Sequence, residues 1–205
     1  MISNGKFYES QFEEATIELL REAHWQYAFG DDIHRKYTDP LIEEDLRNFL
    51  TVQYKDKNLT TSEMDSIVAN LRNTGGQNDY YALRNAFLLY RDGYDFAYSD
   101  GRDNPFRLEY IDFEHPDHNI FRCVNQFVME QGRENRRPDI LLFINGIPVC
   151  IIELKNPTKQ NATIHDAHTQ ICTRYMRDIP ALLKYCALAV ISDGAKNALG
   201  TTYTP

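Results

Sequence analysis

The sequence predicts a mixed α/β fold in which helices dominate the first half and a β-sheet dominates the second. Helical periodicity, with cap and stop signals, recurs before residue 100. Two apolar runs, residues 139–144 and 149–155, flank Asn145-Gly146, a dipeptide typical of β-hairpins. A third apolar run, residues 186–192, has no polar interruption before its end, as expected of a buried strand.

Apolar spacing and boundary residues predict four helices in the first half of the chain. The first has an apolar stripe of Phe12, Ile17, Leu19 and Leu20, and its Glu13 faces either solvent or a functional site. The second begins at Pro40, with Asp39 as its cap. The predicted spans are about 9–24, from 40 onward, 61–73 and 78–91.

The second half alternates strands with helices. Residues 107–113 alternate polar and apolar side chains and predict a strand. The remaining predicted elements, in chain order, are a turn at 116–119, a strand at 121–128, the hairpin, helices at 163–177 and 180–185, and the strand at 186–192. We expect that last strand to be parallel to its neighbour, because a helical crossover connects the two.

The hairpin carries three charged residues that a buried strand seldom contains. Asp139, Glu153 and Lys155 cost free energy there unless they are paired or bind a metal. Carboxylate oxygens suit Mg²⁺, which would neutralise phosphate charge and activate a water molecule. The carbonyl of Leu154 would add a neutral ligand, and Lys155 would orient the water or stabilise developing charge. These residues predict metal-assisted hydrolysis of a phosphodiester; the alternative is a set of ordinary strand-end charges.

The metal site requires Asp139 and Glu153 on one face of the sheet, and this depends on the hairpin register. A two-residue turn without a bulge would place Asp139 opposite Ile152, on the wrong face. We expect a three-residue loop, residues 144–146, with Gly146 as a G1 bulge and Asp139 opposite Ile151, or a bulge elsewhere that restores the same parity.

Several ordered segments resemble the nuclease domain of type I restriction enzyme R subunits. The similar segments are residues 9–13, 85–95, 119–126, 137–148, 152–157, 178–180 and 190–194. The resemblance implies a PD-(D/E)xK endonuclease fold: a restriction-endonuclease-like core with a central mixed sheet flanked by helices, plus an N-terminal helical segment. It also implies Mg²⁺-dependent cleavage of double-stranded DNA, with Mn²⁺ as a possible substitute. Asp139, Glu153 and Lys155 match the catalytic core of that family.

The resemblance further implies that residues 1–205 form a single nuclease domain of a longer subunit. Within it, residues 1–100 are expected to be mainly helical and residues 105–195 to carry the catalytic sheet. The sequence lacks a Gly-x-x-x-x-Gly-Lys-Ser/Thr phosphate loop, so ATP would act only through motor domains beyond this chain. The implied partners are double-stranded DNA, those motor domains, and methylation and specificity subunits. A non-catalytic DNA-binding or regulatory module, or another PD-(D/E)xK repair nuclease, remains an alternative.

One motif departs from the family pattern. The family has Gln-x-x-x-Tyr after the hairpin, whereas here four residues separate Gln170 from Tyr175. On a regular α-helix Gln170 would stack on Arg174 instead. Either Arg174 takes the role of contacting DNA or a nucleotide, or a π-bulge realigns Tyr175 with Gln170. A third possibility is that Tyr175 is a core aromatic residue and Gln170 lies on the surface.

Composition sets limits on function. A hydrophobic content of 42% is typical of a globular protein, and no run of 18 apolar residues or signal sequence occurs, so we expect a cytoplasmic protein. The four cysteines lack Cys-x-x-Cys spacing, which predicts reduced thiols.

The formal net charge of −8 disfavours simple DNA binding. Arg133, Arg136 and Arg137 form either a phosphate-binding cluster or a polar turn.

Overall fold

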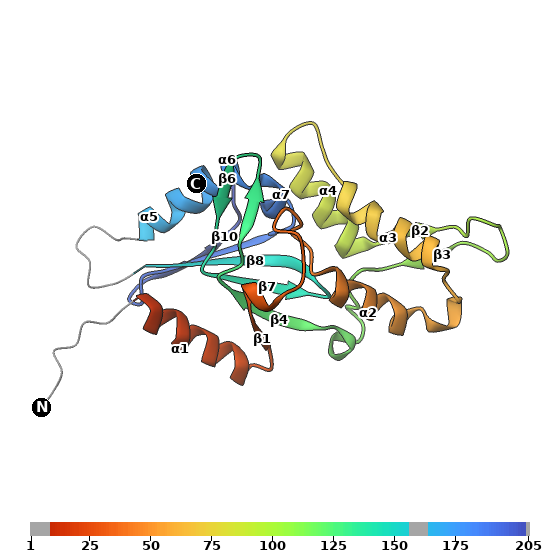
Figure 1. Ribbon diagram of the computed structural model, residues 1–205, viewed down its shortest axis with the longest axis horizontal. Helices are drawn as coiled ribbons and strands as arrows, with labels where there is room; N and C mark the ends of the chain where they lie inside the picture. Colours follow the sequence, from red (N-terminus) through yellow and green to blue (C-terminus); the bar gives the residue numbers. More distant parts are fainter. Residues whose placement is uncertain (1–8, 156–163, 204–205) are drawn as a thin grey trace, which may run out of the picture.

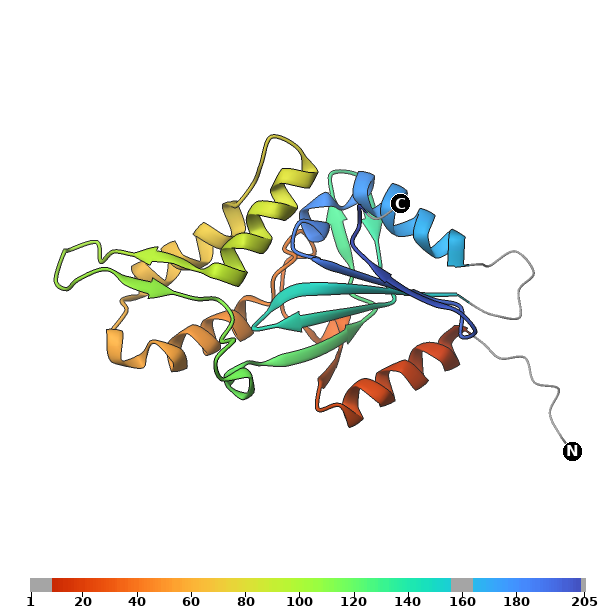
Figure 2. The same cartoon turned by 180° about the vertical axis from the view of Figure 1, so that it is seen from behind.

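A six-stranded mixed sheet forms the centre of the computed structural model, which describes residues 9–155 and 164–203. The strand order is β1-β4-β7-β8-β9-β10, with bounds Gln26–Phe29, Phe121–Asn125, Ile140–Ile144, Ile147–Leu154, Leu188–Ser192 and Asn197–Gly200. Helix α1 (Glu9–Glu22) covers one face, and the helical connection from α5 (Ile164–Thr169) to α7 (Pro180–Leu183) covers the other (Figures 1 and 2). The predicted mixed sheet flanked by helices is therefore confirmed.

The sheet contains both antiparallel and parallel strand pairs. Strands β4, β7 and β8 are antiparallel neighbours; residues 126–139 connect β4 to β7, and a two-residue turn connects β7 to β8. Strands β8 and β9 are parallel, as predicted for strands joined by a helical crossover. β1 is parallel to β4 at one edge, and β10 is antiparallel to β9 at the other. Glu153 thus lies on β8, which has a paired strand on each side.

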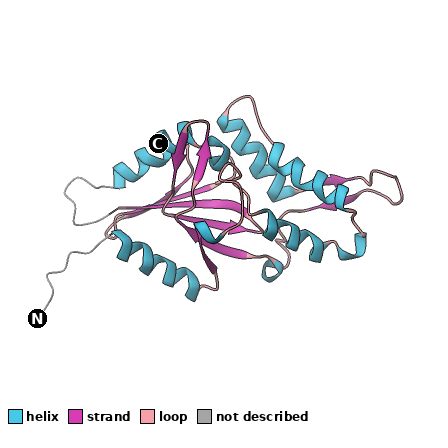
Figure 3. Ribbon diagram, in the orientation of Figure 1, coloured by secondary structure: helices cyan, strands magenta, loops and turns pink. Residues whose placement is uncertain are grey.

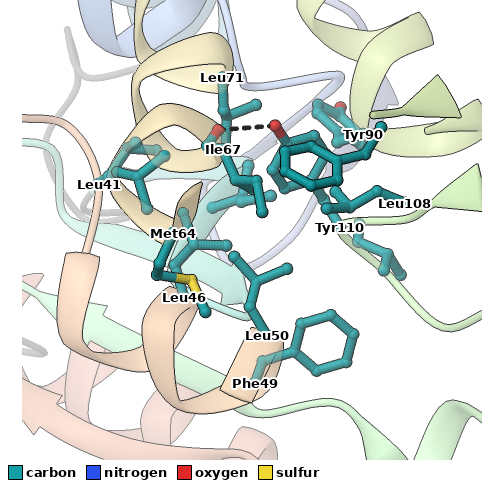
Figure 4. Close-up of a cluster of buried hydrophobic side chains, with 14 of the residues drawn as sticks. Leu41, Leu46, Phe49, Leu50, Met64, Ile67, Leu71, Tyr90, Leu108 and Tyr110 are labelled. Carbon is teal, nitrogen blue, oxygen red and sulfur yellow. Dashed lines mark hydrogen bonds between the residues drawn. The ribbon is translucent and has the colours of Figure 1, made fainter. Parts of the chain in front are cut away.

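The N-terminal helical segment lies at one end of the sheet (Figure 3). It contains α2 (Glu43–Gln53), α3 (Thr61–Asn73) and α4 (Asp79–Asp92), together with a two-stranded ribbon of β2 (Tyr94–Phe96) and β3 (Phe106–Leu108). Figure 4 shows side chains from these elements in one apolar cluster. Ile147 of the hairpin belongs to the same cluster, so the helical segment packs directly against the hairpin.

Local chemistry explains the helix boundaries. Thr60 and Glu63 form a reciprocal capping box at the start of α3, and the Asn78 side chain accepts a hydrogen bond from Tyr81 N at the start of α4. The predicted start of α2 at Pro40 is wrong, since the helix begins at Glu43. The backbone N–H of Ile42 instead donates to Gly146 O at 2.9 Å, which holds this segment against the hairpin turn.

Two further sequence predictions need correction, and several short strands were missed. The strand at 107–113 is only Phe106–Leu108 and lies in the ribbon, outside the main sheet. Leu19 does not face the core, because it is 66% exposed, whereas Ile17 is buried against β7 and β8. Short strands at both sheet edges, β1 and β10, were not predicted, and neither was the ribbon of β5 (Met129–Gln131) and β6 (Glu134–Arg136).

All four cysteines are free thiols, in agreement with the sequence. In the two described ranges, no helix has both the length and the apolar character that a membrane span requires.

Candidate active site

A bulge in β8 sets the register of the hairpin. The turn is two residues long, with Asn145 and Gly146 both at positive φ, as in a type I′ turn. The predicted three-residue loop is therefore wrong. Phe143 pairs with Pro148 but Leu142 pairs with Cys150, so one extra residue enters β8 between these pairs. The alternative prediction, a bulge elsewhere, is confirmed.

This bulge restores the parity that the site requires. Ile140 pairs with Ile152, so continuing the register by one residue places Asp139 opposite Glu153, and not opposite Ile151 as the three-residue loop would give. A direct hydrogen bond supports this placement, because Leu154 N donates to Asp139 Oδ2 at 2.7 Å. The two acidic residues are thus direct neighbours on adjacent strands.

The packing identifies the face on which these carboxylates lie. Leu141 and Ile151, two residues from Asp139 and Glu153, pack in the cluster that includes Ile171 and Tyr175. Ile152 and Leu154 pack on the opposite face against Ile17 of α1, as predicted for the intervening positions. The acidic pair therefore faces the helical crossover.

Two side chains donate hydrogen bonds to the Glu153 carboxylate, and the residue is 1% exposed. Lys155 Nζ donates to Oε1 at 2.7 Å, and the Tyr175 hydroxyl donates to Oε2 at 3.2 Å. Gln170 Nε2 in turn donates to the Tyr175 hydroxyl at 2.6 Å. The structure therefore joins Gln170, Tyr175, Glu153 and Lys155 in one hydrogen-bonded chain.

The electrostatics of this cluster leave Glu153 short of positive charge. Burial and, to a lesser extent, the neighbouring Asp139 carboxylate together raise the pKa of Glu153 to about 8, and Lys155 offsets only part of this. Burial also raises the pKa of Tyr175, so its hydroxyl keeps the proton that it donates to Glu153. An added cation at this position would relieve both the repulsion between carboxylates and the cost of burying Glu153.

A π-helix explains how Tyr175 reaches Gln170. Residues Gln170–Tyr175 form one π-helical segment between α5 and α6 (Met176–Asp178). The wider turn brings residues five apart onto one side, so Gln170 bonds Tyr175 and does not stack on Arg174. The structure contains the π-bulge that the sequence raised, and it also buries Tyr175 in the apolar core, as the third possibility expected of this residue.

Arg174 instead faces an open groove of about 800 Å³ beside the acidic pair. Its lining includes Arg136, Arg137, Gln170, Arg174, Tyr175 and Arg177. Arg136 and Arg177 pair with Asp178, whereas neither Arg137 nor Arg174 has an ion-pair partner in the described parts of the chain. The predicted arginine cluster is thus split, with Arg136 neutralised and Arg137 available in the groove.

Glu13 is held close to the site without touching it directly. Its carboxylate accepts hydrogen bonds from the side chains of Asn125 and Gln126 at the end of β4. The backbone N–H of Gln126 donates to the carbonyl of Asp139 at 3.2 Å. Gln126 therefore lies between Glu13 and Asp139 and contacts both of them.

The sheet order, the helices on both faces and the charged hairpin define a restriction-endonuclease-like α/β protein. Comparison with known families gives the same result: the model of the family described as "Type I restriction enzyme R protein N terminus" matches residues 6–205. The chain belongs to this family.

Curated relatives agree with this assignment. The type I restriction enzyme HindI endonuclease subunit of Haemophilus influenzae is 29% identical over 203 residues, which are 94% of this chain and 19% of that protein. The putative type I restriction enzyme MjaIXP endonuclease subunit of Methanocaldococcus jannaschii is 31% identical over 197 residues, with 92% and 19% covered. The chain thus spans about a fifth of the length of these relatives.

Proposed function

We propose that this chain is the DNA-cleaving part of a type I restriction enzyme R subunit and hydrolyses phosphodiester bonds of double-stranded DNA with Mg²⁺. The observation that carries the proposal is the convergence of Asp139, Glu153 and Lys155 at one end of the hairpin. The chain spans about a fifth of the length of these relatives. We therefore propose, as its partners, ATP-dependent motor domains of the same subunit and separate methylation and specificity subunits.

The residues at this end of the hairpin fit a hard divalent cation. Asp139 and Glu153 supply carboxylate oxygens, and the raised pKa of Glu153 marks a shortage of positive charge beside it. In a β-strand the N–H and C=O of one residue point to the same side, and Leu154 N points at Asp139. The Leu154 carbonyl is therefore directed toward Asp139 as well and can serve as a third ligand.

Each neighbouring side chain has a role that follows from its contacts. A bound Mg²⁺ would supply charge neutralisation on phosphate and an acidified water. Lys155 presents its ammonium on the same face as Glu153, where it can orient that water or stabilise charge that develops on phosphate. Tyr175 fixes the Glu153 carboxylate, and Gln170 fixes Tyr175, so these two act as positioning residues.

Metal titration separates a nuclease centre from a non-catalytic module with the same fold. We expect calorimetry to detect a saturable Mn²⁺ site in the wild-type chain. The Mn²⁺ affinity of Glu153→Gln should be lower than that of wild type by about tenfold or more. Glu22→Gln, an exposed substitution in α1, is the matched control and should bind like wild type. Equal Mn²⁺ affinity in wild type and Glu153→Gln would favour the non-catalytic alternative.

The groove beside the acidic pair is a suitable path for a DNA backbone. Arg137 and Arg174 carry charge that no carboxylate among the described residues neutralises, and Gln170 and Tyr175 connect the groove to Glu153. Two such cations also explain how a chain with a net charge of −8 can contact phosphate locally.

Arg174→Ala and Arg137→Ala should each weaken binding to duplex DNA. For each variant, the loss of affinity should be about the same whatever the DNA sequence. Each should reduce the slope of log affinity against log salt by about one, because each removes one phosphate contact. Arg177→Ala is the matched control, since Asp178 already neutralises Arg177. Fluorescence anisotropy with a labelled duplex across a salt series measures the slopes; an effect of Arg177→Ala as large as that of Arg174→Ala would contradict the assignment.

A further inference from the structure

A second group of ligand-bearing side chains lies in the loop between β3 and β4, in a part of the molecule that the proposed nuclease chemistry does not use. Asp112, His115 and His118 each offer one ligand atom, and these atoms lie within 4.8 Å of one another. Asp112 Oδ2 is 3.0 Å from His118 Nδ1 and 3.7 Å from His115 Nδ1. Within residues 9–155 and 164–203, no other three such groups come together in this way.

The backbone of this loop brings the two imidazoles together. Pro116–His118 form a 3₁₀ turn, and His115 precedes it. Residues three apart are eclipsed in this conformation, and Pro116 restricts the backbone at its first position. The rings of His115 and His118 consequently stack, with centroids 4.9 Å apart and an interplanar angle of 15°.

The carboxylate between the rings is fixed before any ligand arrives. Asp112 Oδ1 accepts hydrogen bonds from the backbone N–H groups of Glu114 and His115, at 3.0 and 2.8 Å. Its Oδ2 accepts one from Gln53 Nε2 at 3.1 Å, and the residue is 4% exposed. Asn119 binds both the N–H and the carbonyl of Asp112. A carboxylate held in this way loses little freedom when it coordinates an ion.

We propose that Asp112, His115 and His118 form a binding site for a divalent transition metal of the zinc type. Two imidazole nitrogens and one carboxylate oxygen are a usual zinc ligand set, whereas Mg²⁺ prefers oxygen ligands alone. Zinc bond lengths of about 2.0–2.2 Å require ligand atoms roughly 3.3 Å apart in a tetrahedron. The separations of 3.0 and 3.7 Å lie on either side of this value, and the exposed rings leave a fourth position to water.

The position of this site gives the metal a structural role. Through Gln53 the cluster connects to the end of α2, and through Asn119 it connects to Asn145 in the turn of the hairpin. A bound ion would thus strengthen the contact between the helical segment and the hairpin that carries the acidic pair. This inference stands on contacts separate from those of Asp139 and Glu153.

Zinc titration of the chelator-stripped chain tests the site. We expect one Zn²⁺ to bind with a dissociation constant on the order of micromolar or tighter. His115→Ala and His118→Ala should each weaken binding by about tenfold or more and abolish the rise in melting temperature that Zn²⁺ gives to wild type. His165→Ala, which removes an exposed histidine of α5, should bind Zn²⁺ like wild type.

Glu153→Gln distinguishes this site from the proposed nuclease centre and should leave zinc affinity unchanged. Circular dichroism and urea unfolding without zinc would establish that the His115 and His118 variants are folded. The inference is overturned if folded His118→Ala retains wild-type zinc affinity, if zinc binding is lost in Glu153→Gln instead, or if wild type shows no saturable binding below about 100 μM.

Discussion

Glu153→Gln, Asp139→Asn and Lys155→Ala should each reduce DNA cleavage by roughly 10³-fold or more when placed in the complete R subunit and assembled restriction complex. Glu153→Gln is nearly isosteric but removes the charge that we propose holds the cation. Asp139→Asn removes the second carboxylate charge, which lies opposite Glu153 in the hairpin. Lys155→Ala removes the ammonium that is hydrogen-bonded to Glu153. Conversion of circular plasmid to linear product, measured over time, reports each rate.

Two controls make this result specific. Glu22→Gln alters an exposed carboxylate of α1 and should cut DNA at the wild-type rate. Because Asp139 and Glu153 would act as one unit, the Asp139→Asn/Glu153→Gln double variant should be no slower than the slower single variant. Full cleavage by any of the three single variants would remove that residue from the proposed centre.

The metal-free chain should lose stability as pH rises, because Glu153 is buried beside Asp139. Its folded-state pKa of about 8 lies above the ordinary value of 4.5, so the folded chain favours the protonated carboxyl. The stabilisation from this group is therefore fully present below about pH 4.5 and is lost as pH rises through about 8. Glu153→Gln cannot ionise and should escape this loss.

Urea unfolding in a chelating buffer measures this effect. Between pH 5 and 9 the unfolding free energy of Glu153→Gln should rise relative to wild type by on the order of a few kcal/mol. Saturating Mg²⁺ should diminish the difference, because a cation favours the ionised carboxylate. Glu22→Gln again serves as the control. If the difference in unfolding free energy between wild type and Glu153→Gln did not change across this pH range, the pKa assigned to Glu153 would be contradicted.

Local signals in the sequence were sufficient for several elements. Helix α3 spans Thr61–Asn73 as predicted, since its capping box and its glycine stop signal act within a few residues. The parallel strand β9 follows from its continuous apolar run and the helical crossover before it. The parity of the hairpin was also predictable, because Asp139 and Glu153 can share a face in only one of the two parities.

Other features depend on contacts between distant segments. Strands β1 and β10 are four residues each and gain their partners only in the folded sheet. The position of the bulge was missed, although Pro148 signals it, because proline within a paired strand occurs mainly at bulges and edges. The sequence raised the π-helix as one of three options, and only the bond between Gln170 and Tyr175 in the folded chain reveals it.

The position of a bound metal tests the central claim most directly. In crystals of the chain soaked with Mn²⁺, anomalous scattering should give a peak between the carboxylates of Asp139 and Glu153, about 2–2.5 Å from their oxygens and near the Leu154 carbonyl. Crystals of Glu153→Gln should lack this peak. The account would be contradicted if wild-type protein that cleaves DNA and is saturated with Mn²⁺ showed no ion at this position in its crystals.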